Sequence, residues 1–147
     1  MAKSDKGLSD AEKAALKERA AELKAEGKRG KGKDKRAAGE KDLLAKIAEM
    51  PEADRVMAEK VHAIVSEVAP HLLPKTMYGM PAYANKAGKV VCFFQAKSKW
   101  DTRNAALVFE DTANLDEGSM WPTSFAIREL TAENERRIAE LMRRAVS

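Results

Sequence analysis

The sequence of 147 residues contains a single cysteine, Cys92. One cysteine excludes an internal disulfide framework and a cysteine-based zinc site. No stretch approaches the roughly 18 uninterrupted apolar residues of a membrane-spanning helix, and no apolar stretch follows the first residues as a signal peptide would require. These absences lead us to expect a cytoplasmic protein without a membrane partner.

The first forty residues lack proline and aromatic side chains altogether. They also carry the whole formal excess of +4 charges, with 12 basic and 8 acidic side chains, whereas the remaining chain holds 15 of each. This asymmetry predicts two parts: residues 1–38 form a basic, helical and flexible N-terminal arm, and residues 39–147 form the folded domain. Because the arm offers little apolar area to bury, we expect it to be dispensable for folding.

The arm contains one strong helix signal. Ser9 and Glu12 have the spacing of a capping box, in which each side chain accepts a hydrogen bond from the other residue's backbone. The strong helix formers that follow predict a helix over 11–26, which Gly27 ends. Leu16 and Leu23 are the only larger apolar side chains on it, so we expect a solvated or lightly docked helix.

A basic run over 28–36 follows this helix. Its charged and glycine-rich composition cannot be buried in a core, which predicts a flexible linker. Two interpretations of the run stay open. The cations can neutralise phosphates of a nucleic acid or meet an acidic partner, or the run can be a solvated tether, since no aromatic is interleaved for base stacking. The cations concerned are Lys28, Arg29, Lys31, Lys33, Lys35 and Arg36.

The second part of the chain has the periodicities of a mixed α+β domain. Apolar residues at helical spacing predict a short helix that stops at Pro51 and a longer one over 52–69, and Thr131 caps a last helix. Strands are predicted over 75–83, 89–97, 102–110 and 121–127, with the doubly apolar run 90–94 as a central strand. We therefore expect an α+β fold with a mainly antiparallel sheet of about four or more strands and helices packed on one side.

The residues that often carry chemistry do not form a catalytic pattern. His62 is predicted on the polar side of a helix near Glu59, and its spacing to His71 is not that of a metal site. Cys92 falls in the middle of an apolar strand and reads as an inert core thiol. With no nucleophile–base pair in evidence, we expect a protein that is not an enzyme.

An acidic segment follows the third predicted strand. Oxygen-rich loops can hold hard cations or iron, although the segment lacks the ligand order of an EF-hand and can equally be solvated. The carboxylates that would form a metal site are Glu110, Asp111, Asp116 and Glu117.

A glycine and a proline interrupt the first predicted strand, and such breaks mark a bend, a bulge or a site where a ligand approaches. Aromatic side chains could join this break around a partly apolar pocket; alternatively they complete the core. The candidate pocket residues are Tyr78, Gly79, Met80, Pro81, Tyr83, Trp100 and Trp121.

Two segments resemble a known family: PKTMYGMPAY over 74–83 and GKVVCFF over 88–94 are similar to the YdhG-like family, the bacterial domain of unknown function 1801. The resemblance covers about residues 43–146. It implies a compact frataxin-like fold, and for one branch an iron chaperone that supplies iron–sulfur cluster assembly. That role implies weak iron binding and iron–sulfur assembly proteins as partners. It relies on an acidic ridge, whereas the carboxylates of this chain are interspersed with Lys41, Lys46, Arg55 and Lys60.

The sequence thus leaves three functions open. The first is a non-enzymatic YdhG-like binding module that acts as an iron chaperone. The second is a small-molecule or peptide binding module that uses the aromatic pocket. The third is an adaptor whose basic arm contacts a nucleic acid or an acidic partner.

Overall fold

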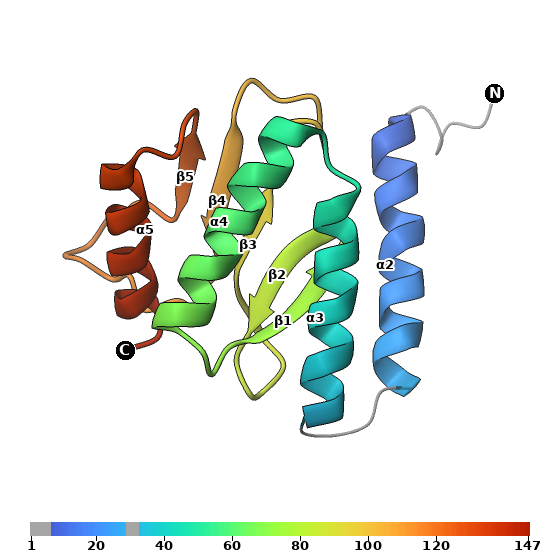
Figure 1. Cartoon of the computed structure of the whole chain (residues 1–147), viewed down its shortest axis with the longest axis horizontal. Coiled ribbons are helices and arrows are strands. Elements are labelled where there is room, and N and C mark those ends of the chain that lie inside the picture. Colours follow the sequence, from blue (N-terminus) through green and yellow to red (C-terminus); the bar gives the residue numbers. More distant parts are fainter. Residues whose placement is uncertain (1–6, 29–32) are drawn as a thin grey trace.

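The structure, a computed structural model, describes residues 7–28 and 33–147. It is an α+β fold in which three helices precede a five-stranded sheet and one helix follows it (Figure 1). The helices are α2 (Asp10–Lys28), α3 (Lys33–Ala48), α4 (Glu52–Val68) and α5 (Ala132–Ala145). The strands are β1 (Leu73–Met77), β2 (Met80–Ala84), β3 (Val90–Gln95), β4 (Ala105–Phe109) and β5 (Ser124–Ile127).

The sheet is an antiparallel meander in the order β1-β2-β3-β4-β5. The expected antiparallel sheet is therefore confirmed, and β3 is its central strand, as its doubly apolar run predicts. Sequential strands pair because short connections join antiparallel neighbours.

One predicted strand is wrong: segment 75–83 is a hairpin rather than a single interrupted strand. Met77 pairs with Met80, so Tyr78 and Gly79 form a two-residue turn, at φ values of 52° and 77°. Positive φ at both central residues gives the turn a twist that matches the flanking strands. The glycine marks the end of a strand here and not a bend within one.

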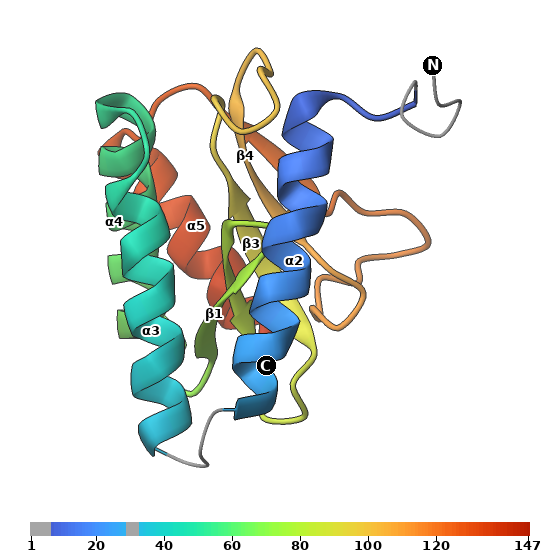
Figure 2. The same cartoon turned by 90° about the vertical axis from the view of Figure 1, so that its right-hand side faces the viewer.

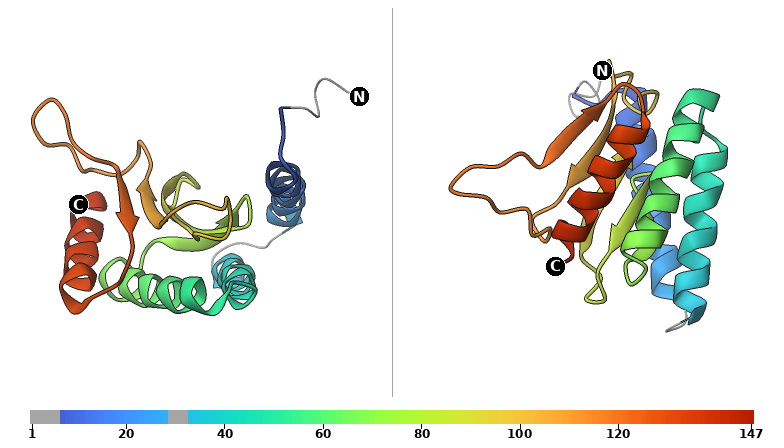
Figure 3. Two further views of the ribbon diagram at one scale, coloured as in Figure 1. Left: turned by 90° about the horizontal axis from the view of Figure 1, so that it is seen from above. Right: turned by 60° about the vertical axis from the view of Figure 1, so that its left-hand side comes forward.

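The helices lie on both faces of the sheet, which corrects the expectation of one covered face. Helices α3, α4 and α5 pack on one face, and α2 lies across the other face beside β1 and β2 (Figures 2 and 3). The main core lies between the sheet and α3, α4 and α5, and includes Leu43, Val61, Phe94 and Leu107. A smaller apolar cluster around Met80 and Phe93 lies apart from it.

Local signals in the sequence place the helix starts well. The capping box forms, since Ser9 N donates to Glu12 Oε1 at 2.8 Å and Glu12 N donates to Ser9 Oγ at 3.1 Å. The expected cap of α5 forms too, because Thr131 Oγ1 accepts from Asn134 N at 3.1 Å. These contacts satisfy backbone N–H groups that have no partner inside the helix.

The expected flexible linker over 28–36 is wrong from Lys33 onward, because α3 begins there. The boundary drawn at residue 38 therefore falls inside α3, next to the buried Gly39. Arg29, Gly30, Lys31 and Gly32 lie outside the described residues. Across 7–28 and 33–147, none of the helices has the length and apolar character needed to cross a membrane.

Candidate functional site

Strand β5 forms one end of the sheet, and β4 is its neighbour there. Phe109 N donates to Thr123 O at 2.7 Å, in the same register that pairs Leu107 with Phe125 and Val108 with Ser124. Backbone groups alternate in direction along an antiparallel strand. The N–H and C=O groups of Ser124 and Ala126 therefore point away from β4, along the outer edge of the sheet.

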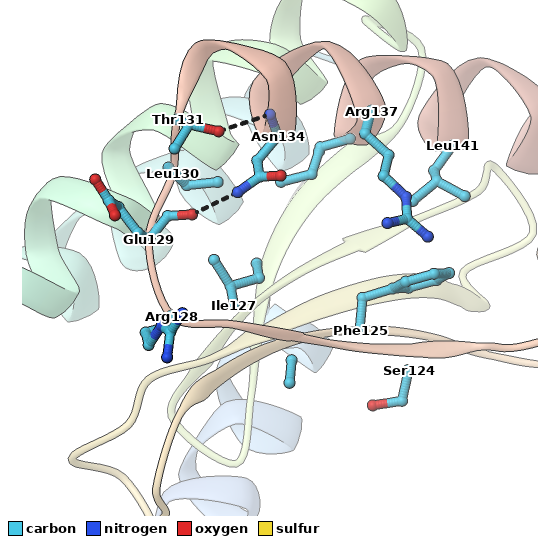
Figure 4. A pocket seen from close by; sticks show the side chains of 12 residues that line it. Ser124, Phe125, Ile127, Arg128, Glu129, Leu130, Thr131, Asn134, Arg137 and Leu141 are labelled. Atoms are coloured by element: carbon cyan, nitrogen blue, oxygen red, sulfur yellow. Dashed lines mark hydrogen bonds between the residues drawn. The ribbon is translucent and has the colours of Figure 1, made fainter.

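A cavity of about 440 Å³ lies between β5 and α5. Phe125 and Ile127 point from β5 toward α5, whereas Ser124 points to the opposite side (Figure 4). We call this space the β5–α5 groove. It is lined by Ser124, Phe125, Ala126, Ile127, Arg128, Glu129, Leu130, Thr131, Asn134, Arg137, Ile138 and Leu141.

The groove combines an apolar floor with cationic walls. The guanidinium carbon of Arg137 lies 5.6 Å from the centre of the Phe125 ring, a cation–π distance. Phe125 in turn meets the ring of Phe109 edge to face at 6.0 Å, which fixes its orientation. Arg128 adds a second positive charge to the lining, and Glu129 the one negative charge.

The uncharged polar side chains of the lining are those of Ser124, Thr131 and Asn134. The lining contains no histidine, cysteine or lysine, and its hydroxyl groups belong to Ser124 and Thr131. Thr131 Oγ1 already accepts the capping bond from Asn134, whose Nδ2 donates to Glu129 O at 2.8 Å. Glu129 is the one carboxylate of this lining, so the groove offers a ligand mainly apolar and cationic contacts.

The aromatic pocket expected from the sequence is not assembled, because its members lie at opposite ends of the fold. Tyr78, Gly79 and Met80 lie at the β1–β2 turn, and Trp100 in the loop between β3 and β4 at the same end of the sheet. Trp121 precedes β5 and packs near the other end. Pro81 and Tyr83 are fully buried, so neither is accessible to a ligand.

The four carboxylates proposed as a metal site are only partly gathered. Glu110, Asp111 and Asp116 line a cavity of about 580 Å³ together with Trp121. Glu117 instead meets Arg144, with Oε2 at 3.3 Å from Nη2. In the part of the chain that the structure describes, no three histidine, cysteine, aspartate or glutamate side chains form a group that could hold a metal ion.

His62 is not the surface residue that the sequence suggests. Its Nδ1 lies 2.9 Å from the hydroxyl of Tyr83 and its Nε2 lies 3.0 Å from Glu40 Oε2, and its side chain is only 13% exposed. A helical wheel misses this because both partners come from other elements, α3 and β2. Burial raises the pKa of Tyr83 well above its usual range, and electrostatic interactions with Cys92 and Glu40 add to the effect. The three side chains form a polar link from the partly exposed Glu40 to the buried Tyr83.

Cys92 is an inert core thiol, as the sequence indicates. It is fully buried, its Sγ lies 3.8 Å from Met142 Sδ, and burial raises its pKa to about 12. A thiol with so high a pKa is protonated at neutral pH and is a poor nucleophile.

Some cations of the basic run make structural contacts, and others are exposed. Arg36 Nη1 donates to Leu72 O at 2.9 Å, which ties α3 to the start of β1. Lys28 closes α2, Lys33 opens α3, and Lys35 is exposed. Because Arg29 and Lys31 lie outside the described residues, the proposed contact with nucleic acid or an acidic partner stays a prediction.

Comparisons with family models, curated proteins and solved structures give no match for this chain. The YdhG-like resemblance therefore stays a prediction.

Proposed function

We propose that this protein is a non-enzymatic binding module that holds an extended peptide along the outer edge of β5. One observation carries the proposal: a cavity of about 440 Å³ opens directly beside β5, whose outer edge pairs with no other strand among residues 7–28 and 33–147. An extended peptide adds to such an edge through its backbone and gains specificity from side chains placed in adjacent pockets.

The groove also defines the chemistry of the peptide. Phe125, Ile127 and Leu141 offer apolar contact, which favours an aliphatic or aromatic side chain. The two arginines of the lining, Arg128 and Arg137, favour a carboxylate close to that side chain. The expected ligand is therefore a short extended segment that carries an apolar residue next to an acidic one.

Peptide selection from a random displayed library against the full chain tests the proposal. We expect enrichment of segments that pair an apolar residue with an acidic one. Ala126→Pro removes an outward N–H while leaving the β4–β5 ladder intact, since proline is tolerated where the N–H faces away from the sheet. It should weaken binding of a selected peptide by about tenfold or more, which corresponds to at least 1.4 kcal/mol.

Ala126→Thr is the matched control because it keeps the N–H and suits a strand. It should leave the affinity nearly unchanged. For the charged wall, Arg137→Gln should remove the preference for the acidic residue, whereas Arg143→Gln, on the same helix but outside the groove, should not. Equal binding by the wild-type and Ala126→Pro proteins would contradict strand addition.

A further inference from the structure

The β1–β2 turn presents two backbone donors to helix α2. Tyr78 N donates to Glu22 Oε1 at 2.8 Å, and Gly79 N donates to Glu22 Oε2 at 2.8 Å. In a two-residue turn these N–H groups have no partner in the strand ladder, so they need an acceptor from elsewhere. Glu22, which is 9% exposed, supplies both oxygens of one carboxylate.

Three lysines from three elements pair with Glu18 and Glu26, the glutamates one helical turn to either side of Glu22. Lys99 Nζ and Lys46 Nζ lie 2.7 and 2.9 Å from the two oxygens of Glu18. Lys75 Nζ lies 3.1 Å from Glu26 Oε1. Lys46 belongs to α3, Lys75 to β1, and Lys99 to the β3–β4 loop. We call the two N–H groups and the three ammonium groups the turn–lysine surface.

The carboxylates of α2 match this surface by their spacing. Glu18, Glu22 and Glu26 are four residues apart, so they lie on one side of the helix. Arg19 adds a fourth contact, since its guanidinium carbon lies 5.8 Å from the centre of the Tyr78 ring.

Apolar burial contributes little to the docking of α2. Of its residues only Ala15 and Glu22 are buried, and the larger apolar side chains, Leu16 and Leu23, are 50% and 53% exposed. A helix that packs through apolar contacts directs its leucine side chains toward the core. Helix α2 is therefore held mainly through its carboxylates.

We propose that the turn–lysine surface is a receptor for a helix that presents a row of glutamates on one side, and that α2 is the ligand this chain supplies to itself. The partner that fits is a helical segment of another protein with glutamates at positions i, i+4 and i+8. It would replace α2 on the surface. This site is separate from the β5–α5 groove, which lies at the other edge of the sheet.

A labelled peptide of residues 9–28 is the probe, tested against the full chain by fluorescence anisotropy. In the wild-type protein the attached α2 competes at an effective concentration on the order of millimolar, so the peptide should bind poorly. The full-chain variant Glu18→Gln, Glu22→Gln, Glu26→Gln weakens the attached helix and keeps helix propensity. It should bind the wild-type peptide at least about tenfold more tightly than the unmodified protein does.

Matched peptides and further substitutions in the protein distinguish specific recognition of the three glutamates from general electrostatic attraction. A peptide with glutamine at positions 18, 22 and 26 should not bind. A peptide with glutamine in place of Lys13, Lys17 and Lys24 should bind at least as well as the wild-type peptide, since those side chains are exposed. Adding Lys46→Gln and Lys99→Gln to the opened protein should remove binding. The milder Glu22→Gln protein serves if the triple variant does not fold.

Three results would overturn the proposal. One is equal binding of the glutamate and glutamine peptides. A second is the absence of binding to folded, opened protein. The third is displacement of the peptide by single-stranded DNA at an equal concentration of charge, because the surface would then respond to charge alone and not to a helix.

Discussion

At the scale of single residues, Gly79 is the position where backbone conformation and a close contact coincide. Its φ is +77°, and a Cβ there would meet the carboxylate of Glu18 and lie 2.7 Å from Lys99 Nζ. Gly79→Ala should therefore lower the free energy of unfolding by about 1 kcal/mol or more. Urea denaturation measures the loss.

Gly88 offers the matched control for Gly79. Its φ is +84°, but a Cβ there would meet nothing within 4 Å. Gly88→Ala therefore carries the backbone cost alone. If Gly79→Ala is no more destabilising than Gly88→Ala, the side chains of Glu18 and Lys99 move aside from the added Cβ at little cost.

Tyr83 gives a second prediction at this scale. Tyr83→Phe removes the hydroxyl 2.9 Å from His62 Nδ1 and leaves a ring nitrogen without a partner in a largely buried place. We expect a loss of about 1–2 kcal/mol in the free energy of unfolding. Tyr78→Phe is the control, because the contact of Tyr78 with Arg19 uses its ring. Equal losses for the two variants would show that the link from Glu40 through His62 to Tyr83 does not stabilise the fold.

At the scale of elements, the docking of α2 should depend on pH. Partial burial by itself would raise the pKa of Glu18, but hydrogen bonds and charges from Lys99 and Lys46 outweigh it and lower the pKa below its usual value of 4.5. A lowered pKa means that Glu18 stabilises docking above about pH 4.5 and that this contribution is lost as the pH falls through the value in the folded protein.

The amide resonances of Tyr78 and Gly79 report this change, since both groups donate to α2. Acidification below pH 4.5 should shift them toward the positions that they have in the Glu18→Gln variant. Resonances that stay constant while Glu18 titrates would show that α2 remains docked without that charge.

Truncation separates the two helices of the predicted arm. Deleting residues 1–32 removes α2 and its two buried residues, so the melting temperature should fall only modestly. Deleting residues 1–38 also removes the first turn of α3 and the bond from Arg36 to Leu72 O, and should lower it clearly further. Equal melting temperatures for the two truncated proteins would show that the first turn of α3 is dispensable, as the sequence alone suggests for the whole arm.

At the scale of the whole molecule, the sequence predicts the features that are determined by residues close together in the chain. The Ser9 and Thr131 caps, the central β3 and the buried Cys92 all follow from local pattern. The contacts of Glu22 and His62 could not be predicted, because their partners lie 56 and 21 residues away in sequence. The β5–α5 groove could not be predicted from the sequence pattern either, because it depends on the distance between α5 and the end strand β5.

The iron role implied by the YdhG-like resemblance would depend on the charge distribution over the whole domain. Residues 41–147 hold equal numbers of acidic and basic side chains, so no net field concentrates a cation there. With no three-ligand group in the described residues, we expect anaerobic calorimetry to show only weak, unsaturated Fe(II) binding. Saturable binding that shifts the resonances of Glu110, Asp111 and Asp116 would support the iron role instead.

The central claim is that a peptide adds to the outer edge of β5, and amide hydrogen exchange tests it most directly. Without peptide, the N–H groups of Ser124 and Ala126 face away from the ladder and should exchange fast. With a selected peptide bound, both should become protected, while the amides of Tyr78 and Gly79 at the other edge stay unchanged. Saturating peptide that leaves Ser124 and Ala126 unprotected would contradict strand addition at β5.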